Sequence, residues 1–138
     1  MNDKELIDLV LNFTQQIYEL HVKYHPLTQD PTQDISVVFT DYKAEAQNIY
    51  LRYLTKKERK YYTGISSPPK FAGVKSNTLT TVEHTNNGAV VTIYTMTGLL
   101  DFQFILMCQK GQWLINSFKQ RYHSDDRELT YEWQYGKF

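Results

Sequence analysis

The chain is a neutral polypeptide of 138 residues, with fifteen basic and fifteen acidic side chains. This length predicts one domain, residues 1–138, that buries roughly two-thirds of its unfolded surface. The balanced charge argues against a general attraction to nucleic acid or to an anionic membrane. A single cysteine, Cys108, leaves no partner for an intrachain disulfide. Residues 1–5 are charged rather than signal-like, and no stretch approaches ~20 apolar residues, so we expect a cytoplasmic protein.

Aromatic residues make up 14% of the chain, as eleven Tyr, seven Phe and two Trp. Tyrosine is favoured where a ring is half buried and its hydroxyl stays in contact with water. Such a content predicts a cleft or a contact surface. The alternative is a sheet packed with aromatic side chains, and the sequence leaves both open.

The first half of the chain has the periodicity of helices. Asn2 and Glu5 form a capping pair, and Pro26 is expected to end this first helix at His25. A polar loop follows over residues 27–33. The apolar positions of the first helix recur every three or four residues: Leu6, Val10, Phe13, Ile17, Leu20 and Tyr24.

A second helix is predicted from about Asp41 to Leu54. The start of that helix is ambiguous, because residues 35–39 are compatible with a strand or with an early helical turn. A capping box at residues 55–58 predicts a short third helix through Tyr62. Residues 63–73 contain two Gly, two Pro and two Ser, which is the composition of a loop.

The second half of the chain predicts an antiparallel meander. Turns are expected at Gly88, Gly98 and Gly111, and Asn87 before Gly88 is a strong hairpin signal because both residue types tolerate positive φ. Residues 131–135 add an edge strand or a tail. Helices followed by a meander predict an α+β protein with N-terminal helices packed on a curved antiparallel sheet. The predicted strands cover residues 77–84, 89–95, 100–108 and 113–122.

This order of elements resembles the nuclear-transport-factor-2-like cone fold, in which helices close over a bent sheet. Residues 110–117, Lys-Gly-Gln-Trp-Leu-Ile-Asn-Ser, are similar to the K-x-G-x-W-x-I-D-S hairpin of that fold, and Trp133 and Gly136 follow near the C-terminus. With residues 53–57 and the loop at 66–69, these features resemble bacterial immunity proteins of this fold, the Rhs-associated group in particular. The resemblance runs from about residue 42 to the C-terminus.

The resemblance implies a protein that binds and neutralises a cognate polymorphic toxin, without a cofactor and without turnover. The expected partner is the toxin domain, for which a nuclease is one candidate, and a homodimer is left open. Asn116 stands where many relatives carry Asp, which removes a carboxylate from the sheet and argues against a catalytic role there.

The alternative function is that of a small-molecule enzyme or ligand-binding protein, isomerase- or dehydratase-like, that uses the cone cavity. Tyr50, His84, Tyr94 and Asp101 are the candidate pocket residues. A buried Asp101 with a raised pKa would act as a general base. However, Asp101 closely follows the Gly98 turn, where a solvated carboxylate is common.

No other pattern predicts catalysis or a metal site. His21 and His25 share a helix face, as zinc ligands do, but the chain lacks a zincin pattern and a nearby cysteine. Cys108 lies in an apolar strand and is expected to be a small core residue. The basic cluster at residues 56–60 fits a solvated helix face better than a nucleic-acid contact on a neutral protein. We therefore predict no catalytic residue, no metal and no nucleic-acid partner.

The C-terminal stretch mixes carboxylates with aromatic side chains. Carboxylates steer association with a basic partner such as a nuclease, while Trp and Tyr supply anchoring area. The alternative is an edge strand that merely covers the sheet. The predicted partner-binding residues are Asp125, Asp126, Glu128, Tyr131, Trp133 and Tyr135.

Overall fold

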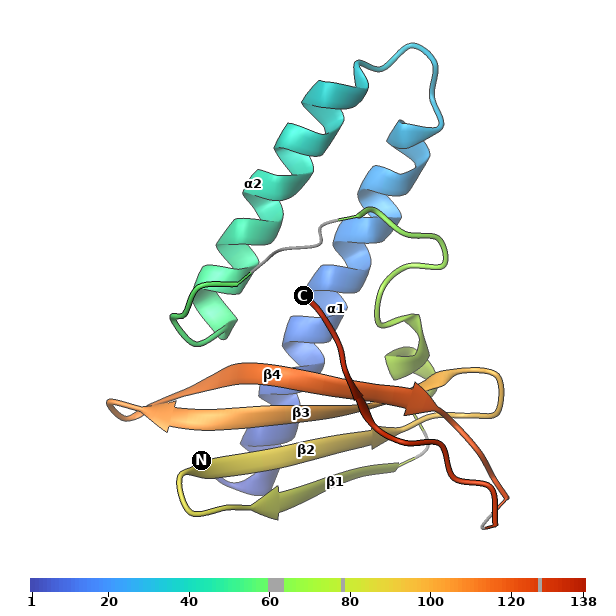
Figure 1. Ribbon diagram of the computed structural model, residues 1–138. Helices are drawn as coiled ribbons and strands as arrows, with labels where there is room; N and C mark the ends of the chain where they lie inside the picture. Colours follow the sequence, from blue (N-terminus) through green and yellow to red (C-terminus); the bar gives the residue numbers. More distant parts are fainter. Residues whose placement is uncertain (60–63, 78, 127) are drawn as a thin grey trace.

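The computed structural model describes residues 1–59, 64–77, 79–126 and 128–138. Within these residues, two long helices precede five strands, which form one antiparallel sheet in the order β1-β2-β3-β4-β5 (Figure 1). The predicted α+β class, with helices packed on a curved antiparallel sheet, is confirmed. The elements are α1 (Asp3–Thr28), α2 (Ile35–Tyr53), the 3-10 helix η1 (Ala72–Ser76), β1 (Leu79–His84), β2 (Gly88–Tyr94), β3 (Leu100–Gln109), β4 (Gln112–Tyr122) and β5 (Gln134–Tyr135).

Helix α1 begins at the predicted capping box but ends one turn later than predicted. The side chain of Asn2 accepts a hydrogen bond from the backbone N–H of Glu5 at 2.9 Å. Pro26 lies inside the helix, which continues to Thr28. Proline removes one backbone donor and crowds the preceding turn, so it is disfavoured inside a helix, and α1 continues for only two residues beyond Pro26.

Helix α2 begins at Ile35, so the ambiguous residues 35–39 are helical. Its N-cap is Asp34, whose carboxylate accepts a hydrogen bond from the backbone N–H of Ser36 at 3.0 Å. The helix thus begins six residues before Asp41, and of the two alternatives left open for residues 35–39 the helical one is correct. The start signal was the Asp-x-Ser spacing, which precedes the apolar positions.

The predicted third helix is absent over the described residues 55–59, and residues 60–62 lie outside the described part of the chain. Thr55, the predicted N-cap, instead donates its hydroxyl hydrogen to Oδ1 of Asn116 at 2.9 Å. Its backbone N–H donates to the carbonyl of Ile115 at 3.0 Å, and Arg59 donates to the carbonyl of Asn116 at 2.9 Å. Contacts with β4 therefore replace the local helical hydrogen bonds.

The three predicted turns are present, and two of them contain residues with positive φ. Gly98 has a φ of 90°, and Lys110 and Gly111 have φ values of 53° and 78°. At the first turn, however, neither Asn87 nor Gly88 has a positive φ, so the reason given for that glycine was wrong. A Cβ at Gly88 would overlap the backbone carbonyl of Leu106 on β3, so Gly88 permits the close approach of two strands instead.

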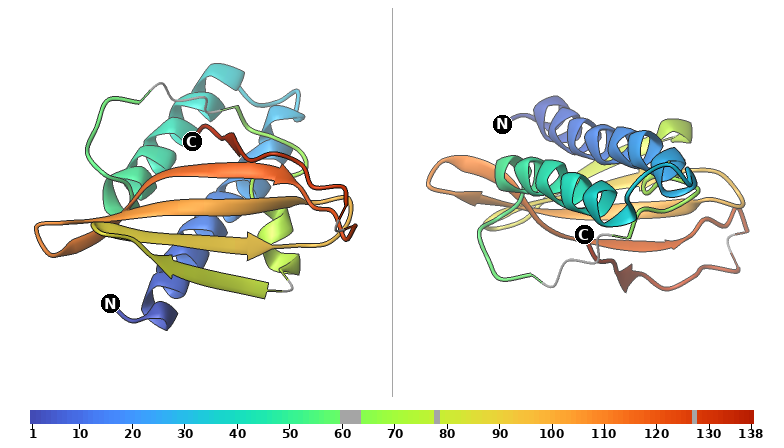
Figure 2. Two further views of the ribbon diagram at one scale, coloured as in Figure 1. Left: turned by 60° about the horizontal axis from the view of Figure 1, so that its bottom comes forward. Right: turned by 90° about the horizontal axis from the view of Figure 1, so that it is seen from above.

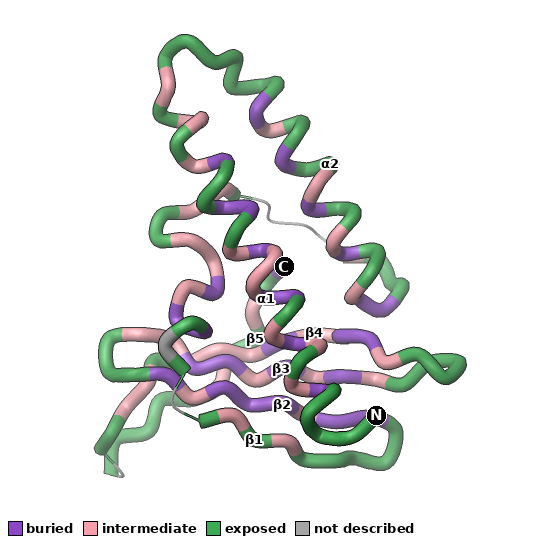
Figure 3. The backbone as a smooth tube through the Cα atoms, turned by 180° about the vertical axis from the view of Figure 1, so that it is seen from behind, coloured by how far each residue is buried: buried purple, intermediate pink, exposed green. Residues whose placement is uncertain are grey.

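Both helices lie on the same face of the sheet, and the distal part of the α1–α2 hairpin extends beyond the sheet (Figures 2 and 3). The register of β3 and β4 shifts between Ile105 and Leu106, opposite Asn116 on β4. A bulge of this kind bends a strand and increases its twist, which supports the curvature of the sheet.

An aromatic cluster fills the space between the helices and the sheet. The ring of Phe13 on α1 lies 6.0 Å from that of Phe71 and 6.5 Å from that of Phe104. Phe138, at the end of the chain, inserts its ring 4.9 Å from that of Phe118 and 5.7 Å from that of Phe13. The aromatic content of the chain is thus used largely for core packing.

Candidate partner-binding surface

The C-terminal segment, defined as residues 123–135, begins at a histidine held between two carboxylates. Nδ1 of His123 lies 2.9 Å from Oδ1 of Asp101, and its Nε2 lies 2.8 Å from Oδ1 of Asp125. The hydroxyl of Thr97, in the β2–β3 turn, donates to Oδ2 of Asp125 at 2.5 Å. Hydrogen bonds from His123 to Asp125 and Asp101 raise the pKa of the imidazole above its usual 6.5.

Asp101 is buried, with a relative exposure of 1%. Its Oδ1 accepts hydrogen bonds from the backbone N–H of Thr95 at 2.8 Å and from the hydroxyl of Thr95 at 3.2 Å. Oδ2 lies 3.5 Å from Nε of Arg121 on β4. The expectation of a solvated carboxylate was wrong, because Asp101 joins the β2–β3 turn to β4.

Two cations on β4 lie against the aromatic rings of the C-terminal segment. The guanidinium of Arg121 is 4.1 Å from the ring centroid of Trp133, and the ammonium of Lys119 is 4.9 Å from that of Tyr135. Lys119 and Tyr135 are directly paired in the β4–β5 ladder, which brings them to the same face. Trp133 is half-buried, whereas Tyr135 remains 68% exposed.

A second exposed aromatic pair lies at the end of β4. The rings of Tyr122 and Tyr131 meet edge to face with centroids 5.8 Å apart, and they are 64% and 44% exposed. Tyr122 was not among the predicted partner-binding residues, and the alternation of β4 places it on the same face as Phe118. Its exposure follows from its position at the end of the strand.

The two other predicted carboxylates lie in an exposed turn. The backbone N–H of Glu128 donates to Oδ1 of Asp126 at 2.9 Å, and the backbone N–H of Asp126 donates to Oγ of Ser124 at 3.2 Å. Both acidic side chains are exposed. The C-terminal segment thus leaves the end of β4, contacts the β2–β3 turn through Asp125 and returns to β4 through β5 (Figure 1).

The four candidate pocket residues do not line one cavity. Tyr50 is buried on α2, with its ring 6.2 Å from that of Phe138. His84 is exposed at the end of β1 and bonds Asp3 of α1 at 2.6 Å. Tyr94 and Asp101 alternate with core residues of β2 and β3, so they lie on the face of the sheet away from the helices.

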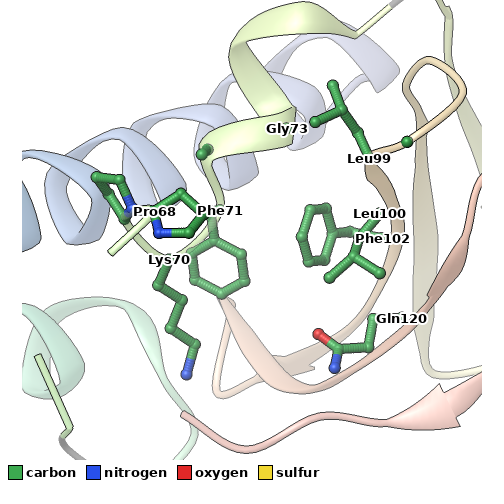
Figure 4. Close-up of a pocket in the computed structure, with 11 residues that line it drawn as sticks. Pro68, Lys70, Phe71, Gly73, Leu99, Leu100, Phe102 and Gln120 are labelled. Carbon is green, nitrogen blue, oxygen red and sulfur yellow. The ribbon is translucent and has the colours of Figure 1, made fainter. Parts of the chain in front are cut away.

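A small hollow opens at the edge of the aromatic cluster (Figure 4). Its volume is about 250 Å³, and its lining includes Phe71, Leu100, Phe102 and Gln120. Drug-sized ligands occupy pockets of roughly 300–1,000 Å³. Lys70 borders this hollow but points away from Leu100, and its ammonium donates to the carbonyl of Lys137. Burial lowers the pKa of Lys70 to about 8.

His21 is buried and holds three parts of the fold together. Its Nδ1 accepts the backbone N–H of Ser66 at 3.0 Å, and its Nε2 lies 3.1 Å from the hydroxyl of Tyr42 on α2. Burial, together with the charge of Lys70, lowers the pKa of His21 to about 4. Both ring nitrogens are therefore used in packing the loop against the helices.

The other features considered in the sequence are a metal site, the cysteine, the basic cluster and a membrane-spanning helix. No group of three or more His, Cys, Asp or Glu is arranged to hold a metal ion in this part of the chain. Cys108 is exposed, so its prediction as a core residue was wrong; the β3–β4 hairpin extends beyond the helices that cover the rest of β3 (Figure 1). The basic residues 56–59 are not helical. No described helix is long and apolar enough to cross a membrane.

Two helices followed by a curved, unclosed antiparallel sheet are the architecture of a nuclear-transport-factor-2-like protein. Residues 5–132 match the family model described as NTF2 fold immunity protein, and the chain belongs to this family. No curated protein and no solved structure matches the chain. This match confirms the predicted family of immunity proteins with a nuclear-transport-factor-2-like fold, and the Rhs-associated group stays a prediction.

Proposed function

We propose that this immunity protein acts in the cytoplasm by binding its cognate toxin with the C-terminal segment and Tyr122, without turnover. The observation that carries the proposal is the aromatic edge. Tyr122, Tyr131 and Tyr135 are each more than 40% exposed there, although the chain buries most of its other large rings. Exposed aromatic side chains are the commonest anchors of protein interfaces.

The filled interior supports binding by the surface rather than chemistry in the cone. Phe102, Phe104 and Ile115 are buried, and Trp113 is half-buried against the same cluster. These are the residues whose packing distinguishes a filled cone from an open one. Because they occupy the space that a substrate would need, an enzyme or ligand carrier of the cone type is the weaker proposal.

The charge of the segment suggests the kind of toxin. Residues 125–132 carry four carboxylates and one arginine in the sequence, in a chain whose total charge is zero. A local acidic patch of this kind accelerates association with a basic protein. We therefore propose a basic toxin domain, for which a nuclease is the leading candidate.

The test compares Trp133→Ala with Tyr18→Ala. Trp133 stacks on Arg121 in the proposed interface. Tyr18 is a matched control, because it makes the same kind of contact on helix α1, where the ammonium of Lys75 is 4.1 Å from its ring. We expect Trp133→Ala to weaken binding of the toxin encoded beside this protein by about 2 kcal/mol, mainly through faster dissociation, and to reduce protection on co-expression. Tyr18→Ala is expected to bind normally.

Two results would contradict the proposal. If the wild-type protein neither binds nor protects against the adjacent toxin, the immunity function assigned to that pair is wrong. If Trp133→Ala and Tyr131→Ala, both folded by thermal melt, bind as well as Tyr18→Ala, the interface lies elsewhere. Sedimentation of the free protein and of the complex then gives the stoichiometry and shows whether a homodimer forms.

A further inference from the structure

The contacts of His123 depend on its protonation state. Both of its ring nitrogens lie within hydrogen-bonding distance of carboxylate oxygens, Asp101 on one side and Asp125 on the other. A carboxylate only accepts, and a neutral imidazole has one donor, so only the imidazolium can donate both hydrogen bonds. With both carboxylates ionised, this geometry therefore requires a doubly protonated ring.

We propose that His123 is a proton-dependent clasp that holds the C-terminal segment in its binding geometry, so that affinity for the toxin depends on double protonation of this ring. The inference rests on the proposed function and adds a mode of regulation to the same surface. The clasp joins β3, through buried Asp101, to the first carboxylate of the segment, Asp125.

The charged groups around His123 favour the protonated ring. Asp101 faces it from β3, Asp125 faces it from its own segment, and Arg121 on β4 pairs with the other oxygen of Asp101 at 3.5 Å. The β2–β3 turn contributes Thr97, which is not titratable in this range and which donates to Asp125. Two carboxylates against one guanidinium leave a net negative charge next to the imidazole.

Loss of one proton releases the exposed side of the clasp. Asp101 is buried, so water cannot replace the imidazole as a donor there, and the single remaining N–H stays on Asp101. The side chain of Asp125 is 77% exposed and exchanges its imidazole partner for water at little cost. Deprotonation therefore loosens the beginning of the C-terminal segment at Asp125, where the hydrogen bond from Thr97 remains, rather than its buried anchor.

The direction of the pH dependence follows from linkage. A histidine whose pKa is raised in the folded state contributes its stabilisation fully below the unfolded value of 6.5. That contribution is lost as the pH rises through the raised folded value. The clasp is therefore closed at mildly acidic pH and open at alkaline pH.

The first experiment uses the free full-length protein. Nitrogen-15 NMR of the imidazoles is expected to show both nitrogens of His123 protonated at about pH 6, with a raised pKa. Asp125→Asn should lower this pKa, whereas Asp126→Asn removes an adjacent carboxylate that does not contact His123 and should leave it nearly unchanged. If His123 is neutral at that pH, or if the two variants change its pKa equally, the proposal that His123 is a proton-dependent clasp is wrong.

The second experiment measures binding of the toxin domain encoded beside this protein. We expect the wild-type Kd to be about fivefold lower at about pH 6 than at about pH 8, the size of one exposed charge-assisted contact. Asp125→Asn should reduce the ratio to less than about twofold, while Asp126→Asn should weaken binding by the same factor at both pH values. If Asp125→Asn keeps the wild-type ratio between the two Kd values, the proposed coupling of His123 protonation to toxin binding is wrong. Absence of binding at either pH would refute the proposed function itself, and the NMR titration would still decide whether the clasp exists.

Discussion

Acid should destabilise this protein through His21, the buried histidine between the helices and the loop. Its Nδ1 is an acceptor for the N–H of Ser66, so Nε2 carries the proton and donates to Tyr42. Protonation of Nδ1 removes that acceptor, places two donors against each other and adds a charge near Lys70. Folding therefore disfavours the imidazolium.

The magnitude follows from the lowered pKa. The unfolded chain binds a proton at His21 near pH 6.5, whereas the folded protein does so only near pH 4. At about 1.4 kcal/mol per pKa unit, the free energy of unfolding should fall by ~2 kcal/mol between about pH 7 and pH 5, and by ~3 kcal/mol at about pH 4. Above the unfolded value, His21 contributes no further dependence on pH.

Urea denaturation at several pH values measures this effect, and variants isolate it from other groups. His21→Gln is expected to be less stable at neutral pH but to lose the ~2 kcal/mol of acid sensitivity that His21 contributes. His25→Gln, on the same helix and half-exposed, serves as the matched control and should keep the wild-type slope. If His21→Gln and His25→Gln have the same slope as the wild-type protein, the assignment of acid sensitivity to His21 is wrong.

Three substitutions, with Gly64→Ala as a control, test the packing and the turns by urea denaturation. Gly88→Ala should cost about 2–4 kcal/mol, because its Cβ would overlap the carbonyl of Leu106; a wild-type midpoint would show that the strands can separate. Gly111→Ala should cost about 1 kcal/mol because of its positive φ, while Gly64→Ala, in open space, should be neutral; equal effects would contradict the backbone argument. Phe104→Ala should cost about 4 kcal/mol, and a loss below ~1 kcal/mol would indicate a loosely packed core.

Local sequence determined the elements whose stabilising groups are close neighbours along the chain. The capping box of α1 needs only Asn2 and Glu5, and the turn at Lys110 and Gly111 needs only residues that tolerate positive φ. The alternating Phe102 and Phe104 likewise predicted the buried face of β3. These features follow from spacing of two to four residues, which a sequence displays directly.

Tertiary contacts determined the local structure wherever a residue distant in the sequence offers a hydrogen bond that competes with the local preference. Thr55 was predicted to cap a helix, but its hydrogen bonds go to Asn116 of β4, sixty-one residues away. Likewise, the clasp at His123 depends on Asp101, which only the β3–β4 register brings next to Arg121 at the end of the strand. Such pairings form when burial excludes water and makes each polar group find a partner, and the position of that partner is set by the packing of the sheet. The sequence alone thus determined the layers and the aromatic, acidic composition of the C-terminal segment, whereas the tertiary structure determined how that segment is held.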